Sequence, residues 1–186
     1  MRSLLHRDLI MADPFETFGV EPRFDLDLRA LEQRHRDLSK ALHPDRYSGA
    51  PAAERRLSLG RAIDVNEAFR VLRDPIRRAE ALLKKSGVTV GETGEPAAPP
   101  ALLMEIMEVR EELSDAARAK DLPAILRLGA TMSARQEATL TKLARAFSDA
   151  ATEPAKIASA LPILGELRYV RRFLDEVSAL EEELSP

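Results

Sequence analysis

Apolar residues recur every three or four positions along most of this 186-residue chain. In one stretch the stripe consists of Leu28, Leu31, His35, Leu38 and Leu42. We find no convincing run of apolar and polar residues that alternate with the period of two expected of a half-buried strand. Because the observed spacing matches the turn of an α-helix, at about 3.6 residues, the sequence predicts an all-α fold.

Prolines and glycines divide this helical pattern into segments. In the first half we expect a short helix at 13–20, opened by Asp13 with Pro14 at its first position, then a helix at about 27–42, a loop at 43–51, a helix at 52–73 and a helix from Pro75 to about Gly87. "GETGEPAAPP" at 91–100 is rich in glycine and proline, which predicts a linker. Beyond it we expect helices at about 100–119, 122–147 and 154–183, whose short connections indicate an antiparallel three-helix bundle.

These segments suggest how the chain is divided into domains. We expect a disordered extension at 1–12, a helical module at 13–87, a linker at 88–100 and the bundle at 101–186. In the helix at 52–73 the core stripe is expected to be Leu59, Ala62, Val65, Phe69 and Leu72.

Composition narrows the class of protein. Hydrophobic residues make up 45% of the chain but aromatic residues only 4%, so the core must be largely aliphatic. A net charge of −3 does not favour a strong polyanion binder. With no cysteine, the chain has no disulfide and no cysteine-ligated zinc or iron–sulfur cluster.

The sequence carries no signal for a membrane or for secretion. No apolar run approaches the roughly 20 residues that cross a bilayer. The start, "MRSLLHRDLIM", is too short and too often interrupted by charge for a signal peptide, and Met11 is an equally good start of the chain. We therefore expect a cytoplasmic protein.

His43, Pro44 and Asp45 stand together where the helix at 27–42 ends. A histidine beside an aspartate is compatible with a catalytic pair, with a fragment of a metal site or with an ordinary helix stop. On the preceding helix a basic stripe falls within about 60° on the side opposite the leucines, and it consists of Arg29, Gln33, Arg36 and Lys40. Alone, this stripe is also compatible with an ordinary solvated surface.

The arrangement of a basic helix, His-Pro-Asp and a second long helix resembles the J-domain of DnaJ co-chaperones. A wider resemblance rests on "FETFGV", "LSKALHPDRY" and "VNEAFRVLRDPIRRAEALL", and after the linker on "LLMEIMEVREELSDA" and "LRYVRRFLDEV". Together these motifs are similar to the HscB family of J-domain co-chaperones for iron–sulfur cluster assembly. The resemblance covers almost the whole chain from Met11 onward. It implies an all-α fold with an amino-terminal J-domain at 13–87 and a carboxyl-terminal three-helix bundle in an L-shaped arrangement.

The resemblance implies that the loop docks on a DnaK/HscA-type chaperone and stimulates ATP hydrolysis by that partner. The expected chaperone-binding residues are His43, Pro44, Asp45, Arg29, Arg36 and Lys40. Proline stiffens the loop, Asp45 can accept a charge-assisted bond from a partner arginine, and the basic residues would steer the domain toward an acidic surface. We do not expect an enzyme, because His35 lies on the apolar face and His6 in the extension.

Further residues of the helical module are expected to serve the fold only. The expected core is Phe15, Phe18, Leu31, Leu38, Val65, Phe69 and Leu72. Asn66 and Asp74-Pro75 are candidates for anchoring helix ends. Ordinary side-chain caps are an equally good interpretation of these residues.

The helix at 102–117 is apolar on two sides. Its natural core stripe is Leu102, Ile106, Val109, Leu113 and Ala116. The other side carries Leu103, Met104 and Met107 beside Glu108, Glu111 and Asp115. A bundle helix needs a partner for a second apolar side, and that partner is either the helical module of the same chain or another protein with apolar and basic groups.

The family resemblance favours another protein, an IscU-type iron–sulfur scaffold. The scaffold-binding residues that it implies are Leu103, Met104, Met107, Glu108, Glu111, Asp115 and Phe173. Met107 stands where a leucine is usual, and Asp115 is a shorter acid than expected. No cofactor or metal is implied, because the zinc-binding cysteine extension of some relatives is absent. The alternative is a general J-domain adaptor whose bundle binds a different client.

Overall fold

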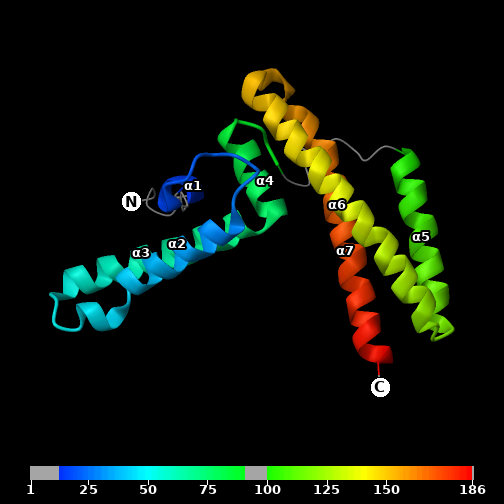
Figure 1. The fold of residues 1–186 in the computed structure, drawn as a ribbon, viewed down its shortest axis with the longest axis horizontal. Helices are drawn as coiled ribbons and strands as arrows, with labels where there is room; N and C mark the ends of the chain where they lie inside the picture. Colours follow the sequence, from blue (N-terminus) through cyan, green and yellow to red (C-terminus); the bar gives the residue numbers. More distant parts are fainter. Residues whose placement is uncertain (1–12, 91–99, 186) are drawn as a thin grey trace, which may run out of the picture. The chain divides into compact units, whose positions relative to one another are not determined.

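The computed structural model describes residues 13–90 and 100–185, and the secondary structure of these residues is helical, without a strand. They form two compact units, which divide between Leu82 and Leu83. The expected extension at 1–12 and most of the expected linker, 91–99, lie outside the described residues. Figure 1 shows the order of the helices along the chain.

The first unit begins with α1 (Pro14–Phe18) and α2 (Leu28–Ala41), and aspartates cap both helices. The carboxylate of Asp13 accepts a hydrogen bond from the amide of Phe15 at 2.8 Å, and that of Asp27 accepts from Arg29 at 2.9 Å. Gly19 ends α1 with a φ of 57°, a left-handed conformation that glycine adopts without strain. The capped first residues of α1 and α2 confirm the helix starts predicted from Asp13, Pro14 and Asp27.

The 3₁₀ turn η1 (Pro44–Tyr47) leads from α2 to α3 (Ala52–Arg73), and the two long helices lie side by side in Figure 1. Their shared core, which α1 closes, contains Phe15, Phe18, Leu31, Val65 and Leu72. All five were predicted to be buried. Leu38 and Phe69, predicted with them, are only partly buried.

The predicted core stripe of α3 is wrong at its amino-terminal end, because Leu59 is 58% exposed. The stripe instead runs through Ser58, Val65, Ala68 and Leu72. Leu59 is turned about 100° from Ser58, which carries its side chain away from α2. Asn66 was expected to anchor a helix end, but it lies inside α3.

The turn between α3 and α4 (Pro75–Lys85) is built around two side chains. Asp74 caps α4, because its carboxylate accepts from the amide of Ile76 at 2.9 Å and from Arg77 at 3.0 Å. The guanidinium of Arg78 is buried, donates to the carbonyl of Leu72 and lies 4.8 Å from the ring centre of Phe24. Burial lowers the pKa of Arg78, against the raising effect of Asp74 and Asp25.

The second unit contains α5 (Pro100–Arg118), α6 (Leu122–Thr152), the 3₁₀ segment η2 (Pro154–Ser159) and α7 (Ala160–Leu184). This is the predicted three-helix pattern, although α6 continues past the predicted end at 147. Asp121 caps α6 by accepting from the amide of Ala124 at 2.9 Å. The core joins all three helices through Leu113, Ala116, Ile125, Met132, Val170, Phe173 and Val177.

α6 and α7 approach closely where Gly129 faces Val177. A Cβ atom at position 129 would lie 2.9 Å from Cγ1 of Val177, closer than ordinary van der Waals contact. The absence of a side chain at Gly129 therefore allows the two helices to pack at this point.

We expect Gly129→Ala to lower the stability of the bundle relative to Gly165→Ala. A Cβ at position 165 of α7 meets nothing within 4 Å, so that control should gain up to about 1 kcal/mol from the better helix propensity of alanine. At position 129 the same gain is opposed by about 1–3 kcal/mol of overpacking, because Val177 is stiff at χ1. Chemical denaturation measures the free energy of unfolding of both variants. Equal stabilisation by the two substitutions would contradict the close approach.

Candidate functional site

The His43-Pro44-Asp45 loop lies where α2 gives way to η1. His43 has an extended backbone, with φ −60° and ψ 134°, as expected for a residue before proline. Its Nδ1 accepts a hydrogen bond from the amide of Asp45 at 3.3 Å and lies 3.5 Å from the carboxylate Oδ2. The Asp45 side chain is 90% exposed. The loop therefore presents both polar side chains to solvent.

Hydrogen bonds to backbone carbonyls hold the loop without using these two side chains. Ser58 of α3 donates to the carbonyl of Leu42 at 3.2 Å. Ser48 donates to the carbonyl of Asp45 at 3.0 Å, and Arg55 donates to that of Ala50 at 3.0 Å. The loop is thus fixed to α3 while His43 and the carboxylate of Asp45 remain accessible.

The basic residues of α2 are exposed, as the helical wheel predicted. Arg29 and Lys40 lie near the two ends of the helix. Between them, Nη2 of Arg36 donates to the Gln33 side chain at 2.8 Å, and Gln33 donates to Asp37 at 3.1 Å. The surface is therefore a positive stripe with an aspartate at its edge.

His35 has a structural role in the first unit. Its ring stacks on Phe69 with 4.1 Å between ring centres, and its Nε2 lies 3.0 Å from Oδ1 of Asn66. The side chain is half-buried, so the expectation that it packs on the apolar face is confirmed. The contact also explains Asn66, which links α3 to α2 instead of ending a helix.

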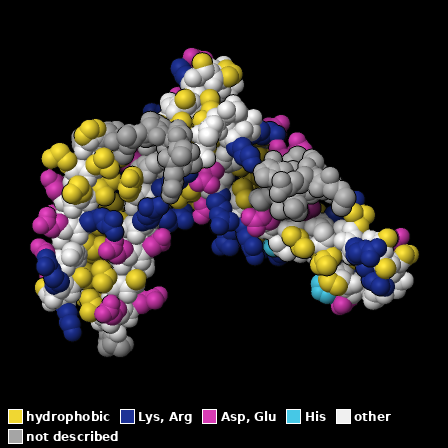
Figure 2. Space-filling view, turned by 180° about the vertical axis from the view of Figure 1, so that it is seen from behind, with side chains coloured by type: hydrophobic (Ala, Val, Ile, Leu, Met, Phe, Trp, Pro, Cys, Tyr) yellow, Lys and Arg dark blue, Asp and Glu magenta, His cyan; other side chains and the backbone are white. Residues whose placement is uncertain are grey.

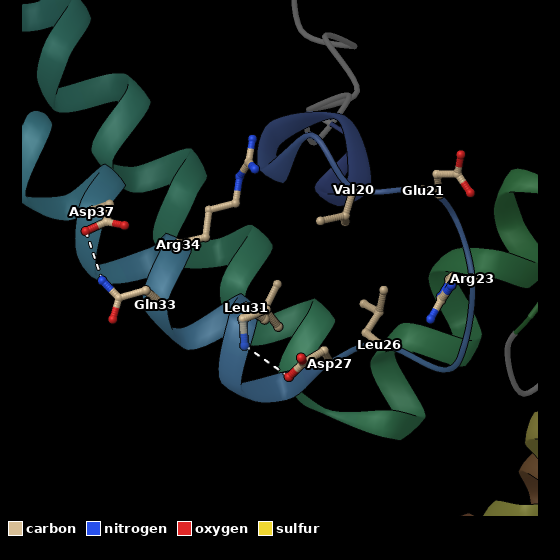
Figure 3. Close-up of a pocket in the computed structure, with 10 residues that line it drawn as sticks. Val20, Glu21, Arg23, Leu26, Asp27, Leu31, Gln33, Arg34 and Asp37 are labelled. Atoms are coloured by element: carbon tan, nitrogen blue, oxygen red, sulfur yellow. Dashed lines mark hydrogen bonds between the residues drawn. The ribbon is translucent and has the colours of Figure 1, made fainter.

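A cavity of about 620 Å³ lies beside the amino-terminal half of α2 (Figure 3). Val20, Leu26 and Leu31 supply apolar parts of its wall. Some of its polar groups have structural roles, since Asp27 caps α2 and Gln33 donates a hydrogen bond to Asp37. The lining contains the carboxylates of Glu21, Asp27 and Asp37 but no histidine or serine, so it holds no serine–histidine pair.

In the part of the chain that the structure describes, we find neither a cluster of metal-ligating side chains nor a helix suited to span a membrane. Within residues 13–90 and 100–185, no group of three or more histidine, aspartate or glutamate side chains is placed to hold a metal ion. None of the helices described there combines the length and the apolar character that spanning a bilayer requires.

α5 carries a second apolar surface, as predicted. The exposed fractions are 38% for Leu103, 64% for Met104 and 70% for Met107. In Figure 2 hydrophobic side chains gather where α5 begins, with acidic side chains at the edge of the same helix. The exposed acidic residues are Glu108, Glu111 and Asp115, and Asp115 pairs with Arg118. This is an exposed apolar patch with an acidic border.

Phe173 does not belong to this surface. Only 4% of it is exposed, and it lies in the bundle core with Val170 and Val177. The expectation that Phe173 shares a surface with the α5 patch is therefore wrong. These three residues follow one another every three or four positions along α7, which places them on its inward side. The exposed aromatic of α7 is Tyr169, which the sequence interpretation missed although it lies one turn before Phe173.

Ion pairs connect α5 to both other helices, and the sequence did not reveal them. Arg135 of α6 donates to Glu105 of α5 and, at 2.9 Å, to Glu166 of α7. The hydrogen bond to Glu105 is the main cause that raises the pKa of Arg135, with partial burial opposing it and Glu166 adding to it. On α5, Arg110 donates to Glu176 of α7 at 3.0 Å.

Known proteins are similar to this chain in sequence and fold over the residues of both units. Residues 98–178 match a family model described as the HSCB C-terminal oligomerisation domain. The co-chaperone protein HscB homolog of Burkholderia multivorans is 35% identical over 170 residues, which are 91% of this chain and 94% of that protein. Chaperone HscB from Vibrio cholerae has a TM-score of 0.80 and 29% identity, covering 92% of this chain and 99% of its own.

The human co-chaperone protein HscB has the same fold, with a TM-score of 0.78 and 26% identity over 91% of this chain and 82% of its own. The similarity thus extends through the helices of both units. Identity at the level of the Burkholderia protein over nearly the whole chain shows that this chain belongs to the HscB family of J-domain co-chaperones.

Proposed function

We propose that this chain delivers an IscU-type iron–sulfur scaffold protein to a DnaK/HscA-type chaperone and stimulates ATP hydrolysis by that chaperone. The observation that carries the proposal is the exposed His43-Pro44-Asp45 loop in a chain of the HscB family. The protein would act by contact and would carry out no chemistry of its own. We expect this to take place in the cytoplasm.

The geometry of the loop suits a docking site. Pro44 fixes its own φ and keeps His43 extended, so little conformational entropy is lost on binding. The exposed carboxylate of Asp45 can accept two parallel hydrogen bonds from a partner arginine. The basic stripe of α2, with Arg29, Arg36 and Lys40, would speed association with an acidic chaperone surface.

The α5 patch supports the second half of the proposal. Leu103, Met104 and Met107 are exposed apolar side chains, and methionine adapts to an irregular partner surface. Glu108, Glu111 and Asp115 would pair with basic groups around the apolar contact. Phe173 enters this proposal as a residue of the core that supports α5 and not as a contact residue.

The burial of Phe173 favours a second candidate function. The family resemblance implied that Phe173 contacts the scaffold, whereas its side chain is only 4% exposed. The bundle would then bind a different client, and the chain would be a general J-domain adaptor. A pull-down with a purified IscU-type scaffold distinguishes the two functions.

We expect His43→Gln to abolish stimulation of the chaperone ATPase while the melting temperature stays nearly unchanged. The side chain is exposed, so its packing contributes little to stability. Steady-state ATP hydrolysis by the cognate chaperone, with and without the variant, is the measurement. A variant that stimulates as well as the wild type would rule out docking through this loop.

Reversing two charges on α2, in Arg36→Glu/Lys40→Glu, should weaken chaperone binding mainly through the association rate. The effect should be largest at low salt, because screening by ions removes long-range steering. A matched control is Lys142→Glu/Arg145→Glu on α6, which makes the same change of net charge at exposed positions. Stopped-flow association at two salt concentrations tests this. Equal slowing by both variants would show that only net charge matters.

We expect replacement of Leu103, Met104 and Met107 by alanine to reduce scaffold affinity by more than about 2 kcal/mol, or roughly thirtyfold in Kd. The stability of the protein should fall by far less than the 2–5 kcal/mol typical of a buried Leu→Ala change. Leu113→Ala is the control for that range, because Leu113 is fully buried. Calorimetric titration and thermal melting measure the two effects. A triple variant that is stable and binds the scaffold normally would assign the patch to another partner.

A further inference from the structure

Two of the three methionines in the described residues lie on the surface of α5. Met104 and Met107 are largely exposed, whereas Met132 of α6 lies in the bundle core. No methionine occurs in residues 13–90, which include the His-Pro-Asp loop and the basic stripe of α2. In the part of the chain that the structure describes, exposed methionine is therefore confined to the apolar patch of α5.

The two methionines supply most of the apolar surface of this patch. Leu103 is only 38% exposed, against 64% for Met104 and 70% for Met107. At about 100° per residue, Met107 is turned by about 40° from Leu103 and by about 60° from Met104, which places it at the centre of the patch. A change in the chemistry of these two side chains would therefore change the whole contact surface.

An exposed thioether is open to oxidation by two electrons. A lone pair of the sulfur attacks one oxygen of hydrogen peroxide, and the O–O bond breaks as an S–O bond forms. The other oxygen leaves as water after proton transfer, so the sulfur is oxidised and the peroxide is reduced. The product, methionine sulfoxide, is polar. Reductases convert it back to methionine, with oxidation of a dithiol to a disulfide and release of the oxygen as water.

Oxidation of the patch would weaken a complex much more than the fold. In the free protein the sulfoxide oxygens would be solvated, because both side chains are exposed. A partner on the patch would bury these oxygens, and a buried acceptor without a donor is unfavourable. Glu108 and Glu111 lie beside the methionines on α5, but carboxylates are acceptors as well and cannot supply the donor.

We propose that Met104 and Met107 form a site of reversible oxidation by peroxide, which turns off scaffold binding by α5 and leaves the His-Pro-Asp loop active. That the partner on the patch is an iron–sulfur scaffold rests on the proposed function. The selectivity of the oxidation is a property of the free protein and can be measured without a partner.

The first measurement is the rate of oxidation at each methionine. Peptide mass spectrometry follows the free protein in dilute hydrogen peroxide. Met104 and Met107 should react at least about tenfold faster than Met132, and the melting temperature should stay nearly unchanged while they do. Equal rates at all three positions, or unfolding as Met104 and Met107 react, would overturn the proposal.

The second measurement is scaffold affinity. The oxidised protein is freed of peroxide and titrated by calorimetry against a scaffold that has not been oxidised. We expect Kd to rise at least about tenfold, because both main apolar contacts then carry a polar oxygen. Treatment with the two methionine sulfoxide reductases, one for each epimer, should restore the original Kd. An unchanged Kd after full oxidation of both residues would contradict the switch.

Met104→Leu/Met107→Leu is the matched control. Leucine keeps the apolar surface and the helix propensity but cannot form a sulfoxide. This variant should bind the scaffold like the wild type, both before and after peroxide. It retains the other methionines of the chain, so a loss of affinity after peroxide would place the damage elsewhere and overturn the proposal.

Met104→Gln/Met107→Gln imitates the oxidised patch without an oxidant. Glutamine is polar, similar in length to methionine and similar in helix propensity. We expect this variant to be as stable as the wild type and to bind the scaffold about as weakly as the oxidised protein. Affinity at the wild-type level would show that the patch tolerates polar groups, which excludes control by oxidation.

The loop shows whether the effect is confined to α5. Stimulation of the chaperone ATPase in the absence of scaffold should be equal before and after oxidation, because residues 13–90 contain no methionine. Loss of this stimulation would contradict a switch that acts only on the scaffold side.

Scaffold binding before oxidation distinguishes the two ways in which the inference can fail. A protein that does not bind the scaffold before peroxide is added would overturn the proposed function, and this inference with it. Equal binding before and after oxidation would overturn the inference alone and leave the proposed function standing.

Discussion

Both compact units are stabilised by the burial of one aliphatic stripe from each long helix. Aromatic residues make up only 4% of the chain, so aliphatic side chains dominate the buried volume and the helices pack closely. The contact of Gly129 with Val177 shows how close this packing is between α6 and α7. A stripe that covers about 100° of a helix leaves most of its circumference to solvent, and the basic residues of α2 and the apolar patch of α5 lie on that remainder.

The two sites use this free surface differently. In the first unit, bonds from Ser58 and Arg55 hold the backbone of the loop, so His43 and Asp45 are positioned without being buried. In the second unit, α5 uses one apolar side for the core and presents Met104 beside Met107 on the other. An exposed loop held by backbone hydrogen bonds and an exposed apolar patch are both suited to contact with protein partners, which agrees with membership of the HscB family.

Much of the fold could be predicted because helix ends depend on local chemistry. Asp13 and Asp27 cap helices at the predicted places, and the exposure of Met107 followed from helical spacing. The predictions failed at Leu59 and at Phe173. Leu59 lies at the edge of the apolar stripe of α3, and Phe173 has the aromatic residue Tyr169 one turn before it. Periodicity alone therefore could not say which side chain is buried.

The sequence by itself determined the helices, their caps, the stiff His-Pro-Asp loop and the two apolar sides of α5, because all of these depend on residues within one or two turns. Only the tertiary structure decided that Arg78 lies buried over Phe24 and that Arg135 joins Glu105 to Glu166. Such contacts bring together residues that are far apart along the chain. Their partners are fixed only when packing sets the distance and rotation between helices, and no local pattern contains that information.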